Sequence, residues 1–463
     1  MKKSYLMIAA AVALFTACAE KDTFREINTQ QENSAIGFKT FTTKQTRAEN
    51  SGETNYNALE AYNTTFRVWG NKYINKGTVT APNLTPTPVF GFTGEGTNAS
   101  PYDYPGEKVE FLETPNSTLI GNWDYDPIRF WDKTASYYDF YAASPFIPKN
   151  AAGSNVIWSF DNDNKKISLP EFTVTGTNRV TTATGQNAAF GVLTTIDKAA
   201  VMSYEQEDLM IATDIPEYTD YTYSTYTTGV NLQFNHILSR LNIAIRKKSP
   251  DLDDYTVKLN SIKIYNMYSN GDFDESRANG QSTPALNAGT IARWDHRTTR
   301  FAPGNMIYEP ATALEITSTS ATTDNTYQYV YEGLVIPQNV GYSKTVLVNE
   351  ANKPQDCLWI NGSNAVSSGD GTWSKPYIVI DYEIGTTTNG TYKKADGYVY
   401  YFNLAEIFGA TAETGGVDFC EGWQNTVKIT LAPVAIKFDA EVAQWDEKFG
   451  EDTPKTGTLF EIQ

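Results

Sequence analysis

The sequence has few of the residues from which catalytic and metal centres are usually built. Its 463 residues include three cysteines and two histidines, His236 and His296. It contains no Gly-x-Ser-x-Gly elbow, Walker loop, His-Glu-x-x-His or Cys-x-x-Cys pattern. Carboxylates are plentiful, so composition leaves a glycosidase open, but the densest acidic cluster, residues 251–254, is typical of a solvated turn. We therefore expect a protein that is not an enzyme, with no catalytic, cofactor-binding or metal site.

Basic residues are also in deficit. The chain has 37 Lys and Arg against 54 Asp and Glu, which gives a formal net charge of −17. Nucleic acids and anionic lipid surfaces both attract basic proteins. Nucleic acid is therefore not expected as a partner, and attachment to a membrane would need a lipid group.

A long apolar run is missing as well. The longest at the start of the chain, residues 6–15, is half the length of about 20 residues that spans a bilayer. It follows Lys2 and Lys3 and ends in Leu-Phe-Thr-Ala-Cys, which is typical of a secretory signal. A small residue before a cysteine at this place predicts a lipoprotein signal peptide over residues 1–17, with the lipid on Cys18. The alternative is an ordinary signal with a chance cysteine.

Residues 18–47 are mostly polar and are predicted to be a tether. Within it, residues 36–42 alternate enough for one short strand. Arg47 and Ala48 follow in a segment without apolar periodicity, where a trypsin-like protease would find a cleavage site. On composition alone, a solvated arginine in a linker is the other interpretation.

The rest of the chain predicts an all-β fold. Thr, Tyr, Val, Ile and Phe are abundant, and short runs with alternating apolar residues are joined by Gly- and Pro-containing loops. Such a pattern favours two β-sandwich domains in series, 48–225 and 226–445, divided within the Tyr- and Thr-rich stretch 215–229. Residues 377–384 and 398–404 should pair as antiparallel neighbours.

Several local features carry their own expectations. Residues 127–131 are predicted as a strand, and the acidic tip 161–164 as a hairpin turn rather than a calcium loop. The apolar run 232–245 changes parity, which predicts a bulge or kink at Ser239-Arg240. His236 shares the parity of the apolar residues, so a buried neutral imidazole bonded to the backbone is expected.

Two cysteines remain beyond the leader, Cys357 and Cys420. An exported protein permits a disulfide between them, which could contribute about 4 kcal/mol. Two separately buried thiols are the alternative.

Five segments of the chain, in their order and spacing after a lipoprotein leader, resemble the fimbrillin (Mfa-like, type V pilin) family of Bacteroidales. The resemblance implies two transthyretin-like β-sandwich domains in a lipoprotein exported to the outer membrane and cell surface. It also implies polymerisation with other fimbrial subunits into adhesive fimbriae, after an arginine-specific protease cuts between Arg47 and Ala48 and removes the first strand. The segments are Phe140–Pro145, Asp208–Ala212, Phe234–Leu241, Gly333–Gln338 and Ile436–Trp445.

The C-terminal extension, residues 446–463, has two interpretations. It is a donor strand that fills the place of the removed strand in a neighbouring subunit by β-augmentation, or it stays with its own domain as a frayed tail or an edge strand. Three other roles stay open for the whole chain. They are a tip or anchor subunit, a surface lipoprotein that binds glycans or host proteins without polymerising, and a hydrolase.

Overall fold

The computed structural model describes residues 35–42, 59, 63–74, 77–78, 81–82, 86–91, 106–112, 122–132, 134–135, 137–150, 154–174, 208–212, 229–265, 267–268, 270–275, 281–282, 289–290, 293–296, 306–308, 312–321, 324–325, 327–341, 375–432, 435–444 and 455–461. Strands make up most of these residues, and the α-helix among them, α4 (Leu404–Ile407), has four residues. The expectation of an all-β fold is confirmed.

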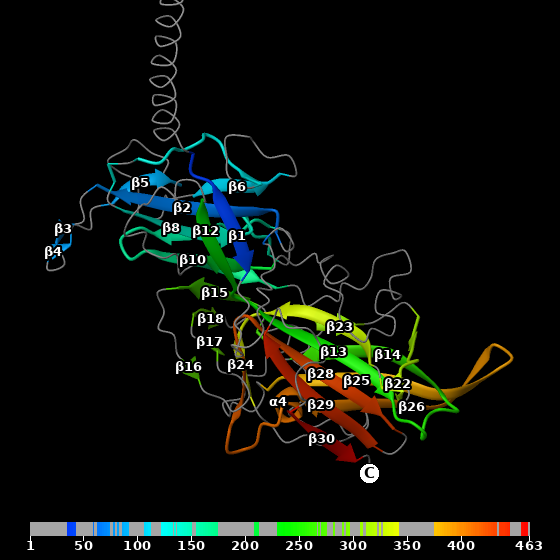
Figure 1. The fold of residues 1–463 in the computed structure, drawn as a ribbon. Helices are drawn as coiled ribbons and strands as arrows, with labels where there is room; N and C mark the ends of the chain where they lie inside the picture. Colours follow the sequence, from blue (N-terminus) through cyan, green and yellow to red (C-terminus); the bar gives the residue numbers. More distant parts are fainter. Residues whose placement is uncertain are drawn as a thin grey trace, which may run out of the picture.

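A sheet of eight strands forms the upper part of the molecule in Figure 1. Its strands alternate their side chains between two buried faces. Phe66 and Val68 point into one core and Trp69 into another, and all three are fully buried. In sheet order the strands are β1 (Phe38–Thr42), β12 (Val230–His236), β11 (Met210–Ala212), β8 (Tyr137–Ser144), β2 (Thr65–Tyr73), β6 (Glu107–Phe111) and β7 (Trp123–Asp124), and β5 (Thr87–Phe90) also pairs with β2.

A four-stranded sheet draws its strands from both halves of the chain. β9 (Ser159–Asp161) and β10 (Lys166–Thr173) form the predicted hairpin, and β10 pairs with β15 (Asn270–Asp274), which pairs with β18 (Trp294–His296). The predicted turn at the hairpin tip is confirmed, because Asp161 Oδ1 accepts hydrogen bonds from two backbone N–H groups of the turn. This shared sheet lies between the upper and lower parts of the molecule (Figure 1).

The shared sheet is packed against both parts. The Trp69 ring of the eight-stranded sheet stacks on Phe160, with ring centroids 5.1 Å apart. The Trp294 indole Nε1 donates to the carbonyl of Ile237, where the chain crosses from one half to the other, at 2.8 Å. One continuous core therefore runs from Trp69 through the shared sheet into the second half of the chain.

Two five-stranded sheets face one another across the core of the second half. The predicted pairing of 377–384 with 398–404 is confirmed, since these residues lie in antiparallel neighbours. The first sheet has the order β23 (Gln328–Val335), β13 (Ser239–Lys247), β28 (Trp423–Leu431), β29 (Ala435–Gln444) and β30 (Lys455–Glu461); the second has β19 (Met306–Tyr308), β14 (Thr256–Tyr265), β25 (Tyr377–Thr388) and β26 (Thr391–Asn403), with β20 (Leu314–Glu315) on β14.

Four two-stranded ladders complete the described strands. They are β3 (Gly77–Thr78) with β4 (Ala81–Pro82), β16 (Gln281–Ser282) with β17 (Gly289–Thr290), β21 (Ser320–Ala321) with β22 (Asp324–Asn325), and β24 (Gln338–Gly341) with β27 (Gly416–Phe419).

Two local expectations were wrong. The run 232–245 is not one kinked strand, because β12 belongs to the eight-stranded sheet and β13 to a sheet of the second half. The parity changes at residues 237–238 because the chain changes sheets there. It leaves the eight-stranded sheet after His236.

Residues 127–131 were expected to form a strand, and they form only an isolated bridge at Phe130. Pro127 has no backbone N–H to give to a ladder. The neighbouring strand is instead β7, just before this segment.

Candidate functional site

Strand β1 is an edge strand of the eight-stranded sheet and lies beside β12 (Figure 1). The two run parallel, in a register that joins Phe38 to Val230 and Thr42 to Phe234. The N–H of Val230 donates to the Gly37 carbonyl at 2.7 Å, so the pairing begins one residue before the strand itself. This ladder is the first of two contacts that hold β1.

The second contact lies on the residues just before β1. The N–H of Ile36 donates to the Arg129 carbonyl at 2.9 Å, and Ala35 forms an antiparallel bridge with Phe130. The Tyr125 hydroxyl donates to the Ile36 carbonyl at 2.6 Å and lies 3.3 Å from the N–H of Arg129. The beginning of β1 is therefore bonded to a segment at the opposite end of the sheet. We call the place between β12 and residues 125–130 the β1 seat.

The centre of the β1 seat is aromatic. Phe38 is fully buried, and its ring meets four other rings edge-on, which is a favourable geometry for aromatic pairs. The centroid distances are 5.5 Å to Phe90, 5.7 Å to Phe66, 5.7 Å to Tyr125 and 6.2 Å to Phe140.

The side chains of Ile36, just before β1, and of the first residues of β1 alternate between the core and the surface. Ile36 and Phe38 are fully buried, Lys39 is exposed and Thr40 is partly buried. The Thr40 Oγ1 atom is buried, and it has no hydrogen-bond partner in the part of the chain that the structure describes. Thr40, two residues after Phe38, therefore holds a buried polar atom without a partner among the described residues, which is costly.

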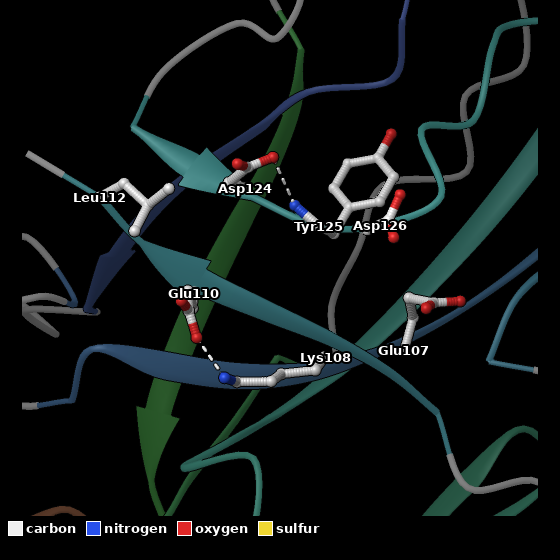
Figure 2. A pocket seen from close by; sticks show the side chains of 7 residues that line it. All are labelled: Glu107, Lys108, Glu110, Leu112, Asp124, Tyr125 and Asp126. Carbon is white, nitrogen blue, oxygen red and sulfur yellow. Dashed lines mark hydrogen bonds and ion pairs between the residues drawn. The ribbon is translucent and has the colours of Figure 1, made fainter. Parts of the chain in front are cut away.

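A hollow of about 270 Å³ lies beside Tyr125. Figure 2 shows the Lys108 ammonium directed at Glu110, and the Tyr125 N–H directed at Asp124, to which it donates at 2.8 Å. Two of its carboxylates, those of Glu110 and Asp124, thus have partners already. It is lined by Glu107, Lys108, Glu110, Leu112, Asp124, Tyr125 and Asp126.

The predicted site residues are mostly beyond the described ranges. Cys18, Arg47, Ala48 and Cys357 lie outside them. Cys420 is a buried free thiol whose Sγ lies 3.8 Å from the Asp418 carbonyl, and burial raises its pKa to about 12.

His236 is buried, as expected, and a carboxylate lies beside its ring. Its Nδ1 lies 2.7 Å from Asp208 Oδ2, and both side chains are almost inaccessible. The backbone carbonyl of Asp208 accepts from Asn63 Nδ2 at 2.8 Å. This pair lies next to the place where the chain crosses from one half to the other. Asp208 stands two residues before Met210, which is the partner of His236 in the ladder of β11 and β12. Knowledge of that strand pairing would have predicted the contact.

A buried ion pair connects the shared sheet to the second half. Arg293, just before β18, donates through Nε to Glu421 Oε2 at 3.1 Å, and Glu421 lies between β27 and β28. Burial raises the pKa of Glu421 to about 7 although the Arg293 charge opposes the shift. The Arg293 guanidinium also lies over the Phe273 ring, 5.2 Å from the centroid.

The described residues hold neither a cluster of metal ligands nor a membrane-spanning helix. Within the ranges given above, no three His, Cys, Asp or Glu side chains come together to hold a metal ion. No helix in the described part of the chain is long and apolar enough to cross a membrane.

Several solved structures are similar to the chain at low identity. A fimbrial protein from Bacteroides vulgatus has 15 % identity and a TM-score of 0.45, over 89 % of this chain and 100 % of that one. A putative cell adhesion protein from Bacteroides uniformis has 14 % identity and a TM-score of 0.32, over 89 % and 98 %. The tip fimbrial protein Mfa3 from Porphyromonas gingivalis, with a C-terminal truncation, has 10 % identity and a TM-score of 0.27, over 83 % and 95 %. No curated protein matches the chain.

The family assignment comes from the sequence of the chain. A family model described as fimbrillin-like matches residues 81–445, which is well over half of the chain and includes strands of the eight-stranded sheet, the shared sheet and both sheets of the second half. The chain belongs to the fimbrillin-like family.

Proposed function

We propose that the chain is a structural subunit of surface fimbriae of the type V class. It is exported as a lipoprotein with the lipid on Cys18, cleaved after Arg47, and polymerised by donor-strand exchange with other subunits on the outer surface of the cell. The observation that carries the proposal is the position of β1. This buried strand ends at Thr42, five residues before Arg47, so one cut separates it from all later strands.

Loss of β1 would leave the β1 seat unsatisfied. The parallel ladder of β12 would become an open edge, and the pocket of Phe38 would face water. Burial of a phenylalanine side chain alone contributes about 1.5–3 kcal/mol. An extended segment from another subunit would restore both the ladder and the buried ring by β-augmentation.

The proposed donor is the C-terminal segment. β30 is the last strand of its sheet and pairs with β29 alone. The structure thus has this segment as an edge strand of its own half, one of the two expected alternatives. A terminal edge strand can leave its sheet without breaking any other ladder, which supports its proposed second use in a neighbour.

The proposed role is non-catalytic. The partners are other fimbrial subunits, the outer membrane through the lipid on Cys18, and a host glycan or protein at the adhesive surface. Tip and anchor subunits would share the same strand exchange, and cell adhesion would be the common outcome.

The test is cleavage of the purified precursor, produced from Ala19 onward, with an arginine-specific protease. We expect a new N-terminus at Ala48 and a ladder of oligomers on gels of unheated samples. Arg47→Lys is the matched control, since it keeps the charge and removes the cleavage site.

Two results would contradict the proposal. Cleaved protein that stays monomeric would favour a surface lipoprotein that does not polymerise. Equal ladders from uncut Arg47→Lys would show that assembly does not depend on removal of β1.

A further inference from the structure

The far ends of β25 and β26 form an arm that extends beyond their sheet. The ladder of β14 and β25 ends at Gly385, and beyond it the two strands continue as a ribbon. Asn389 and Gly390 close this ribbon with positive φ angles of 53° and 75°, as a two-residue hairpin turn requires. The arm, residues 385–397, projects from the lower part of the molecule as the orange hairpin in Figure 1.

One face of the arm attaches it to the body of the molecule. Side chains alternate along a strand, so every second residue of β25, from Glu383 to Thr387, belongs to this attached face. Three side-chain contacts hold it: the Thr387 hydroxyl 2.8 Å from the Thr256 hydroxyl, the Lys258 ammonium 3.8 Å from the centroid of the Tyr392 ring, and Lys394 Nζ 3.2 Å from Glu383 Oε2.

The opposite face, which we call the open face, is turned to solvent. The register of β25 and β26 shifts beside Ala395, so Asp396 lies on the same face as Lys393 although the two positions differ in parity. Tyr398 follows at the root of the arm and is partly buried. The exposed members of the open face are Thr386, Thr388, Thr391, Lys393 and Asp396.

The Asp396 carboxylate is held in a fixed orientation. Its Oδ1 accepts from the N–H of Gly397 at 2.9 Å, and its Oδ2 accepts from the Tyr398 hydroxyl at 3.0 Å. Burial raises the pKa of Tyr398, so this hydroxyl keeps its proton and stays a donor. The Tyr398 ring is itself stacked on Tyr382 and Tyr400, with centroids 5.1 Å and 5.9 Å apart. Each carboxylate oxygen keeps a lone pair for a further donor from solvent or a ligand.

The composition of the open face selects a class of partner. The core of a protein interface is apolar, whereas the exposed members of this face are hydroxyls, one carboxylate and one ammonium. A sugar ring has C–H groups on its faces, which pack on aromatic rings such as Tyr398, and hydroxyls around its rim, which a fixed carboxylate accepts. The chain has a net charge of −17, so an anionic ligand is repelled least where a lysine stands on a projecting arm.

We propose that the open face of the arm binds an oligosaccharide that carries a carboxylated sugar. Lys393 pairs with the sugar carboxylate, Asp396 accepts from neighbouring sugar hydroxyls, and the ring of Tyr398 borders the sugar ring. The inference rests on the proposed function, because it names the adhesive surface through which a fimbrial subunit contacts a glycan. Repetition of the arm along a fimbria would strengthen weak single contacts by multivalency.

The first experiment uses the uncut chain, produced from Ala19 onward and coupled to fluorescent beads. The beads are applied to an array of oligosaccharides that includes sialyllactose, hyaluronan fragments and lactose. We expect signals on members that carry a sialic or uronic acid and none on neutral lactose. These signals should weaken as salt is raised, because the pairing with Lys393 is exposed to solvent.

The second experiment measures the affinity of variants for the acidic oligosaccharide that gives the strongest signal, by surface plasmon resonance. Lys393→Gln should lower the affinity about fivefold, and Asp396→Asn at least about tenfold. Lys394→Gln is the matched control, since it removes the same charge from the attached face, and it should change the affinity less than about twofold. Denaturant unfolding of each variant checks that the fold is intact.

Several outcomes would overturn the inference. They are an array without signals on acidic members, equal signals on lactose, and binding that Lys393→Gln and Asp396→Asn leave unchanged. A dimer of the uncut chain that Lys393→Gln dissociates would show that the open face meets a second copy instead. The proposed function is tested separately, because cleaved wild type that forms no ladder would contradict it whatever the array shows.

Discussion

Phe38 is the residue on which the seating of β1 depends most. Its ring is fully buried among four aromatic neighbours. We expect Phe38→Ala to lower the free energy of unfolding by about 3–5 kcal/mol, the usual loss for a buried phenylalanine. Denaturant titration of the uncut chain measures it.

The matched control for this variant is the next residue. Lys39 is exposed on the same strand, so Lys39→Ala should change stability by less than about 0.5 kcal/mol. Equal effects of the two variants would show that β1 contributes no buried ring to the folded state.

Two glycines with the same backbone conformation provide a second residue-scale prediction. Gly106 has φ +74° and Gly390 has φ +75°. A Cβ on Gly106 would lie 2.2 Å from Arg67 Cγ, whereas no heavy atom lies within 4 Å of that position on Gly390. Gly390→Ala should cost about 1 kcal/mol for its backbone alone, and Gly106→Ala at least about 2 kcal/mol more for the overlap.

Thermal unfolding of both glycine variants measures the difference. Similar losses of stability in the two variants would mean that the Arg67 side chain moves away from the new Cβ without destabilising the fold. That outcome is not expected, because Arg67 is buried, donates to the Phe146 carbonyl at 3.1 Å and lies over the Phe146 ring.

At the scale of elements, the joint between the shared sheet and the second half should respond to pH. Glu421 has a pKa near 7 in the folded chain against an ordinary value of 4.5, because burial favours the neutral form. The folded state therefore binds more protons than the unfolded state between these values, and stability falls as pH rises from about 4.5 to about 7. Each unit of pKa difference corresponds to about 1.4 kcal/mol.

Glu421→Gln removes this titration and keeps the shape of the side chain. We expect its stability to depend less on pH than that of the wild type between pH 4.5 and 7, as measured by denaturant unfolding at several pH values. Parallel curves for the two proteins would contradict the assignment of this pH dependence to Glu421.

Strands with clear alternation could be predicted from the sequence, and their assignment to sheets could not. The pairing of β25 with β26 followed from two neighbouring runs with matching parity. The break at residues 237–238 looked like a bulge because a change of parity is the same whether the chain kinks within one sheet or enters another. The pairing of β10 with β15 joins residues about a hundred positions apart, which no local pattern encodes.

The candidate site was predicted only in part for the same reason. The alternation of residues 36–42 indicated the strand, since Ile36 and Phe38 follow a period of two. Nothing local indicated its second side, because Arg129 lies in a segment that was expected to be a strand and Tyr125 lies just before that segment. Their role depends on a contact between the two ends of a curved sheet.

At the scale of the whole molecule, the shared sheet should make the two halves unfold together. Its strands come from both halves, and the core around it is continuous from Trp69 to the strands of the second half. We expect coincident transitions when tryptophan fluorescence and far-ultraviolet circular dichroism follow denaturant unfolding. Two separated transitions would show that the halves are independent domains.

The direction of β1 has a last consequence. Because it runs parallel to β12, its carboxyl end points toward the second half, and any replacement must enter with the same sense. Molecules joined through the β1 seat would all have the same orientation along the filament, in a head-to-tail arrangement. The filament would therefore have two chemically different tips. One tip would carry an open β1 seat and the other a free C-terminal segment, so gold particles bound to an epitope near Gln463 should mark one tip in electron micrographs.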